Sequence, residues 1–292
     1  MRSEKSAWPF MTPFLLLFVL FLVGPLVYAF YISLFVSNFG SMTFIGFRNY
    51  ALAVQTTAFW DSILRVLYYG VLQAVLMLGL ALILALLLDT PYARGKRFFR
   101  LLYFLPYAVP GVLAAILWGF LYSTKFDPLL AYLHLNPFSP GLLLYSILNI
   151  TIWEWVGYNM TLYAASLGGQ SPSILEAARL DGCSEWTLAL KVKLPLLQPT
   201  IVMTVLLSMI GSIQLFNEPF ILQSLTAISP SYTPNIYIFN MAIGAANEPF
   251  GATFAVLLGA ITLLLSLLGL GIMRLIGIRR GRSQDNGIAS LA

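Results

Sequence analysis

The chain has 292 residues, of which 59% are hydrophobic and only 9% are charged, and its mean hydropathy is +0.85. Soluble domains carry about 25% charged residues, so this composition excludes a soluble protein and indicates a membrane protein. Segments such as Val75 to Leu88 are apolar on every face, whereas the strands of a membrane β-barrel alternate apolar and polar residues. We therefore expect an all-α, polytopic membrane protein.

Residues suited to metal binding or catalysis are scarce. The single cysteine, Cys183, and the single histidine, His134, are too few for a zinc site, which takes three or four ligands. A nucleotide-binding P-loop is missing, because Gly95-Lys96 is followed by Arg97. We expect no metal, no catalytic residue and no cofactor on this chain, so that ATP and magnesium, if used, belong to another chain.

Six stretches of 22 to 24 residues are long enough to cross a bilayer. The first lies in a run without charges from Ser6 to Phe47, which is much longer than a signal-peptide core, so we expect it to stay in the mature protein. Residues 1–292 are then one transmembrane domain. The predicted spans are Pro13 to Val36, Val66 to Leu88, Leu101 to Tyr122, Leu142 to Ala165, Ile201 to Leu222 and Gly251 to Met273.

The positions of the basic residues predict the orientation. With both termini in the cytoplasm, thirteen Lys and Arg residues lie on that side and only Arg48, Arg65 and Lys125 lie outside, as the positive-inside rule requires. The net charge of +5 is thus a topology signal, and no nucleic-acid partner is expected. The thirteen are Arg2, Lys5, Arg94, Lys96, Arg97, Arg100, Arg179, Lys191, Lys193, Arg274, Arg279, Arg280 and Arg282.

The polar cytoplasmic loop 166–200 reads as two short helices separated by a turn. Its signals are a helix start at Ser171-Pro172, a capping box from Ser173 to Glu176, a stop at Asp181-Gly182, a new cap at Ser184 and an end at Leu194-Pro195. Helices of about ten residues are marginal in water, so a docking partner is expected to hold them. Ile174, Leu175 and Leu180 would be apolar anchors. The alternative is an amphipathic connector on the inner membrane surface.

Within this loop, Glu176-Ala177-Ala178, then Gly182, then Val192-x-Leu194-Pro195 stand at fixed spacing. This pattern resembles the EAA loop of the membrane subunits of binding-protein-dependent ABC importers, with Val192 where the family usually has Ile. The resemblance covers most of the chain and is strongest to the sugar-transport branch, of the maltose and glycerol-phosphate type. Shorter similarities are Phe44 to Tyr50 and Phe216 to Phe220.

The resemblance implies the type I importer permease fold in a bacterial or archaeal inner membrane, working by alternating access. It implies a second homologous permease subunit, two cytoplasmic ATPase subunits, an extracytoplasmic sugar-binding protein and a carbohydrate substrate. The loop would be the coupling helix that docks into the ATPase. The residues carried over to that role are Glu176, Ala177, Ala178, Asp181, Gly182, Leu194 and Pro195.

Two acidic residues lie within predicted spans, where ionisable groups are costly and usually face a cavity. Glu154 is halfway along the fourth span, beside Trp155 and one turn from Tyr158, a combination suited to a sugar. The alternative is a carboxylate that hydrogen-bonds a neighbouring helix. Because Glu154 and Glu218 would repel an anion, we favour a neutral sugar.

In the fifth span, Gln214, Asn217 and Glu218 are predicted to share a helical stripe, with Pro219 disturbing the helix. These three are further candidates for the substrate path. The alternative is a helix that ends there in headgroup water.

The function predicted is an ATP-driven carbohydrate importer, in which this chain forms half of the pathway. The main alternative is a proton- or ion-coupled secondary transporter, with Glu154 or Glu218 carrying the ion. That alternative leaves the EAA spacing unexplained. An intramembrane enzyme is less favoured, because no nucleophile, base and orienting group occur together.

Overall fold

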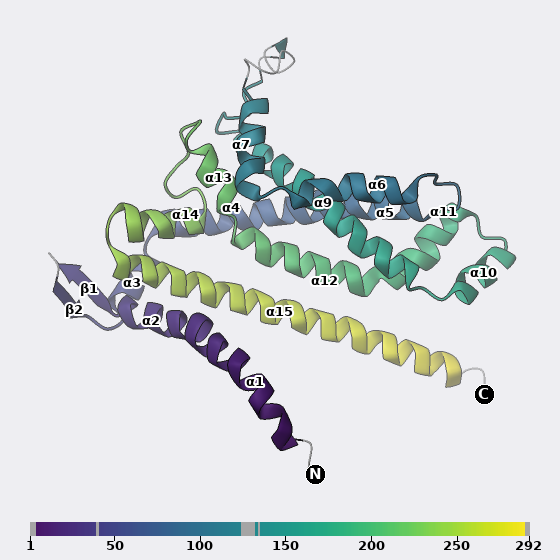
Figure 1. Ribbon diagram of the computed structural model, residues 1–292, viewed down its shortest axis with the longest axis horizontal. Helices are drawn as coiled ribbons and strands as arrows, with labels where there is room; N and C mark the ends of the chain where they lie inside the picture. Colours follow the sequence, from purple (N-terminus) through teal and green to yellow (C-terminus); the bar gives the residue numbers. More distant parts are fainter. Residues whose placement is uncertain (1–3, 39–40, 124–131, 134, 290–292) are drawn as a thin grey trace. The chain divides into compact units, whose positions relative to one another are not determined.

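A computed structural model describes residues 4–38, 41–123, 132–133 and 135–289 (Figure 1). Helices dominate these residues, and the strands among them form a single hairpin. The chain divides into two compact units. Unit 1 comprises residues 1–63 and 230–263, and unit 2 comprises residues 64–229 and 264–292. His134 lies outside the described residues.

Unit 1 holds the first predicted span and the residues that follow it. Its elements are α1 (Glu4–Phe18), η1 (Val19–Val23), α2 (Gly24–Ser33), β1 (Phe35–Asn38), β2 (Ser41–Phe44), α3 (Arg48–Val54), the start of α4 (Thr57–Gln73), α14 (Pro234–Phe239), η5 (Asn240–Gly244) and the start of α15 (Glu248–Ala289). The antiparallel hairpin pairs Phe35 with Phe44 and Asn38 with Ser41. Because the hairpin begins at Phe35, the helix of the first predicted span ends at Ser33 and not at Val36.

The link between the hairpin and α3 explains the sequence from Phe44 to Tyr50. Gly46 has φ +60, a left-handed conformation that suits glycine. The buried side chain of Asn49 then donates hydrogen bonds to the carbonyl oxygens of Ser33 (2.9 Å) and Phe35 (2.7 Å). Asn49 thereby hydrogen-bonds the last carbonyl of α2, which has no partner in a following helical turn, and the first carbonyl of β1.

Unit 2 is built around α9 (Leu143–Gly168), which packs against α5 (Gly79–Asp89), α6 (Lys96–Phe104) and α12 (Leu194–Ile213). Between α4 and α5 lies a π-helical turn, η2 (Ala74–Leu78). Small residues allow the helices to approach closely, as is usual in membranes. The buried core comprises Met77, Leu78, Ala81, Ala85, Leu88, Val156, Met160, Tyr163, Leu167 and Leu197.

The third predicted span is not one helix. It consists of α6, the short 3₁₀ helix η3 (Leu105–Ala108) and α7 (Gly111–Leu121), and the chain bends by 96° between the last two. Pro110 caps α7 in an extended conformation, because proline cannot continue the hydrogen bonding of the preceding turn. The expected single span is therefore a broken one.

The fifth span also differs from the prediction. A continuous helix runs through α11 (Glu185–Leu188), the π-helical turn η4 (Ala189–Lys193) and α12, so Leu194-Pro195 does not end a helix. The break comes instead at residues 214–216, after Ile213, and α13 (Asn217–Leu222) follows it. Pro219 is predicted to disturb the helix, and the break does lie one turn before it, because proline has no amide to donate to the carbonyl of Leu215.

Four helices are long and apolar enough to cross a membrane among the described residues, or five if the bent pair is one span. The four are Phe10–Ser33, Thr57–Asp89, Glu185–Leu222 and Glu248–Gly271, and the bent pair is Lys96–Ala108 with Gly111–Leu121. Helix α9, at the predicted fourth span, has 26 residues but falls outside this set. The count of six spans and the cytoplasmic location of both termini stay predictions.

The backbone of α6 lies so close to Gly157 of α9 that no side chain fits between them, and this contact allows a prediction about stability. A Cβ atom there would overlap the backbone carbonyl of Tyr103 in α6. We expect Gly157→Ala to lower the free energy of unfolding by about 1–3 kcal/mol or more, because the backbone of α6 cannot move aside as a flexible side chain can. The matched control is Gly79→Ala, whose added Cβ meets nothing within 4 Å. Thermal unfolding in detergent should show a lower midpoint for the first variant only; equal midpoints would contradict the contact.

Candidate functional site

A cavity of about 250 Å³ lies within unit 2, between α4, α9, α12 and the segment that precedes α13. Its wall carries hydroxyl and amide groups as well as apolar surface, so it can hydrogen-bond a polar ligand. Among the polar lining residues are Tyr69, Gln73, Thr151, Asn159, Thr204, Ser208 and Ser212.

Five of the six residues predicted for the substrate path line this cavity. Trp155 and Tyr158 come from α9, Gln214 comes from the break between α12 and α13, and Asn217 and Glu218 are the first two residues of α13. The expectation that the last three share a stripe of one helix is wrong, because the helix is interrupted among them. The interruption nevertheless brings them to the same cavity. Their role in binding stays a prediction.

Glu154 does not line the cavity, although it lies close to it. Its side chain and that of Glu218 are buried, and the Oε1 atom of each lies 3.4 Å from the position that a Cβ atom would take on Gly111. The Nδ2 atom of Asn217 is 3.7 Å from the same position. Two carboxyl groups and an amide therefore converge on the first residue of α7. The Oε2 atom of Glu154 is buried and has no hydrogen-bond partner among the described residues.

An aromatic cluster stands beside the cavity. The ring of Tyr107 stacks on Tyr158 at a centroid distance of 4.7 Å and meets Trp155 edge-on at 5.1 Å. Tyr107 lies in η3, next to the break in the third span. The break thus places an aromatic ring from a second segment against the two rings of α9.

The sequence analysis missed the polar residues of α4 and α12. Gln73 accepts a hydrogen bond from Ser212 (2.7 Å), and the hydroxyl groups of Tyr69 and Thr151 are 2.7 Å apart. A signal for them exists, since Tyr69 and Gln73 are four residues apart within the second predicted span and so share a face of its helix.

The loop 166–200 has the two helices that its sequence predicts. Helix α10 (Pro172–Leu180) ends before Gly182, whose φ of +83 is the left-handed conformation expected of a helix stop. The side chain of Ser184 then caps α11 by accepting a hydrogen bond from the amide of Thr187 (3.2 Å). The predicted capping box at Ser173 is absent, because Ser173 lies inside α10 and its hydroxyl is 2.8 Å from that of Ser171.

Helix α10 is the least buried helix of the loop, with no buried residue. Glu176, Ala177, Asp181 and Gly182 are exposed, and Ala178 is half-buried. Apolar side chains accompany them: Leu180 is 89% exposed and Trp186 is 74% exposed, and Ile174 is also exposed. Leu194 and Pro195, predicted for the same role, lie instead within the continuous helix at the start of α12. In Figure 1, α10 and α11 lie together at the end of unit 2 remote from α7 and α13.

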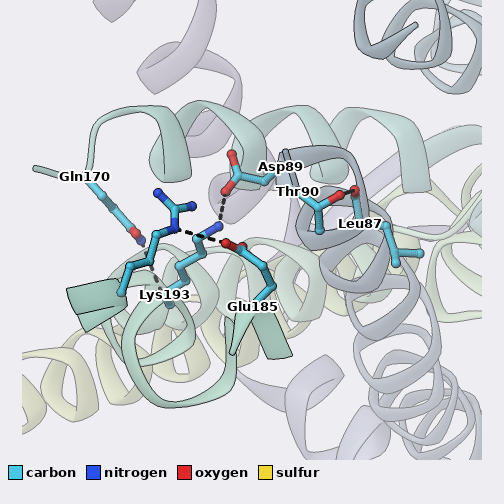
Figure 2. Close-up of polar contacts among 7 residues, drawn as sticks. Leu87, Asp89, Thr90, Gln170, Glu185 and Lys193 are labelled. Carbon is cyan, nitrogen blue, oxygen red and sulfur yellow. Dashed lines mark hydrogen bonds and ion pairs between the residues drawn. The ribbon is translucent and has the colours of Figure 1, made fainter. Parts of the chain in front are cut away.

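Two ion pairs hold this loop (Figure 2). Lys193 in η4 pairs with Asp89 at the end of α5, with 2.7 Å between Nζ and Oδ2, and the lysine side chain is only 4% exposed. Arg179 pairs with Glu185 at 3.0 Å, with side chains 43% and 26% exposed. Sequence reasoning found neither pair.

Similar proteins exist in several bacteria. The lactose transport system permease protein LacF of Rhizobium radiobacter is 30% identical over 82% of this chain and 83% of its own length. The sn-glycerol-3-phosphate transport system permease protein UgpA of Rhizobium meliloti is 29% identical over 78% of this chain and 80% of its own. These relatives are permease subunits, so the chain is a transport component and not an enzyme.

A crystal structure of a bacterial ABC transporter involved in the import of the acidic polysaccharide alginate has the same fold. The TM-score is 0.80 at 19% sequence identity, covering 94% of this chain and 98% of that one. The family described as binding-protein-dependent transport system inner membrane component matches residues 77–282. That match spans more than half of the sequence, and the chain therefore belongs to this family of inner-membrane, multi-pass permeases of ABC importers.

Proposed function

We propose that this chain is one of two permease subunits of a carbohydrate importer, and that loop 166–200 couples it to a cytoplasmic ATPase. The observation that carries the coupling role is the exposed apolar surface of α10 and α11, in a loop with the EAA spacing. An exposed leucine and tryptophan on short helices are typical of a surface that is covered in an assembly. The second subunit would be a homologous chain that completes the pathway.

ATP and its magnesium ion would be held by two copies of the partner ATPase, since this sequence has no P-loop. An external binding protein would deliver the sugar, in keeping with the binding-protein-dependent family. Closure of the ATPase dimer would displace α10, and the permease would alternate between states open to either side of the membrane. The residues assigned to docking are Glu176, Ala177, Ala178, Asp181 and Gly182.

The cavity of unit 2 is the proposed sugar site. Its polar groups could bind sugar hydroxyls, and the rings of Trp155 and Tyr158 could pack against the apolar face of a sugar ring. Gln214, Asn217 and Glu218 add two side-chain amides and a carboxyl group at the broken helix. The names of several relatives, which specify sugars, support a carbohydrate substrate.

The cavity is also unsuited to an anionic sugar. Its lining residues include one acid, Glu218, and no Lys, Arg or His, and Glu154 lies just behind. An anion removed from water needs a counter-charge, and these carboxyl groups supply none whether ionised or protonated. We therefore propose an uncharged saccharide as the substrate.

The docking surface can be tested by purifying the tagged chain from its native membrane and identifying the proteins that co-purify. We expect an ATPase subunit and a second permease with the unaltered chain.

Leu180→Ser should weaken ATPase binding at least about tenfold, because burying one leucine contributes about 1.5–3 kcal/mol. Glu176→Lys should abolish recovery of the ATPase. Tyr92→Ser, which alters an 82% exposed residue outside the loop, is the matched control. Purification of the chain alone, able to move substrate without ATP, would refute the proposal.

The sugar site can be tested with Trp155→Ala. Loss of a cavity-lining ring should raise the KM for uptake at least about fivefold, since truncating an anchor side chain commonly costs more than 1 kcal/mol. Leu113→Ala removes an exposed side chain that does not line the cavity and should leave KM unchanged. Uptake at varied sugar concentration, with ATP hydrolysis recorded in parallel, distinguishes the two. An equal KM for both variants would place the sugar elsewhere.

Charge selectivity can be tested by calorimetric binding to the purified membrane complex, without the binding protein, so that only the permease cavity selects. Neutral disaccharides should bind at least about tenfold more tightly than uronic acids or sugar phosphates of similar size, because the lining offers anions no cation. Gln214→Arg, which adds a cation to the lining, should reduce that difference. Tight binding of a uronate by the unaltered complex would contradict an uncharged substrate.

A further inference from the structure

One ion pair, formed by a buried lysine and a carboxylate that is 24% exposed, joins two helices that are distant in the sequence. The Nζ atom of Lys193 lies 2.7 Å from the Oδ2 atom of Asp89, and 104 residues separate the two along the chain. Lys193 is the last residue of η4, and Asp89 is the last residue of α5. Figure 2 shows the lysine side chain extended toward the carboxylate. The pair thus connects the end of α5, directly after the second predicted span, to the π-helical turn within loop 166–200.

The burial of Lys193 makes it costly to separate the two charges. Lys193 is only 4% exposed, and Leu188 and Leu197, on the same helix to either side, are fully buried. A buried ammonium group is unfavourable unless it is paired, and moving Asp89 away would leave the charge of Lys193 buried without a counter-charge. The two groups are therefore expected to stay together when the helices move.

The location of Asp89 is best explained by this pairing. A carboxylate at the C-terminus of a helix opposes the helix dipole, so the helix itself gains nothing from it. Lys193 supplies the compensating charge. A second contact fixes the lysine from the other side, because the side-chain amide of Gln170 donates a hydrogen bond to the Lys193 carbonyl oxygen (3.2 Å).

We propose that Lys193 and Asp89 are positioning residues for energy coupling, which make α5 move together with loop 166–200. This inference rests on the proposed function, since the loop must be the element on which the ATPase acts. Helix α12 continues directly from η4, and α9 ends two residues before Gln170. The ion pair adds α5, so that the three helices forming the core of unit 2 receive a displacement of the loop together.

The ion pair between Arg179 and Glu185 provides an internal comparison. It joins α10 to α11 within the same loop, but both side chains are partly exposed, and exposed pairs contribute little. A variant that removes the Arg179–Glu185 pair therefore shows what the loss of any ion pair in this loop does to transport.

The test uses the complete complex, purified through this chain and reconstituted in proteoliposomes with the binding protein. ATP hydrolysed and sugar imported are measured together. The double variant Lys193→Met with Asp89→Asn removes both charges without stranding either, so the complex should still assemble. We expect its ratio of ATP to sugar to rise at least about fivefold, the lower end of typical coupling between sites. Lys193→Arg, which keeps the charge, should stay within about twofold of the unaltered ratio, and Glu185→Gln should leave it unchanged.

A double variant with the unaltered ratio would overturn the inference, as would an equal rise in Glu185→Gln. Lys193→Gln alone, which keeps an N–H donor for Asp89 and leaves only a carboxylate that is 24% exposed, serves if the double variant does not assemble. It should give a smaller rise, and no rise would again overturn the inference. The unaltered complex is measured first: if it imports no sugar with ATP, the proposed function itself fails, whatever the variants do.

Discussion

A helix in hydrocarbon has no water to receive its backbone amide and carbonyl groups, so it can be interrupted only where protein or a cavity takes them. Unit 2 has two interruptions, before α7 and before α13, and each lies beside the cavity or its aromatic cluster. The second places Gln214 and Asn217 in the cavity wall, and Gly111, at the first, faces Glu154 and Glu218. The polar interior and the broken helices therefore depend on each other.

Local features were largely predictable from the sequence. The turn at Asp181-Gly182 was predicted because a left-handed residue after a helix favours glycine, and Gly182 has that conformation. The two proline predictions had different outcomes. The helix breaks at residues 214–216, one turn before Pro219, as a missing amide donor favours. Pro195 does not end its helix, because it follows a π-helical turn in which the hydrogen-bonding register has already shifted.

Features that depend on distant contacts could not be predicted. Asp89 and Lys193 each resemble an ordinary charged residue at the edge of a span, and only folding brings them together. Glu154 is recognisable as unusual from the sequence, but its position beside Gly111 and Glu218 depends on the packing of α7 and α13 against α9. The family, by contrast, was identifiable from one loop, because the EAA spacing combines residue types and distances that neither helix formation nor membrane insertion alone would require.

The exposed leucine and tryptophan of α10 and α11 also bear on how the cell makes this protein. Leu180 and Trp186 are directed to water in the isolated chain. A subunit synthesised in excess of its partner would present these side chains to chaperones and proteases, which recognise apolar surface. The surface that enables assembly would thus also mark orphan subunits for removal, so that stoichiometric production of the subunits matters to their lifetime as well as to transport.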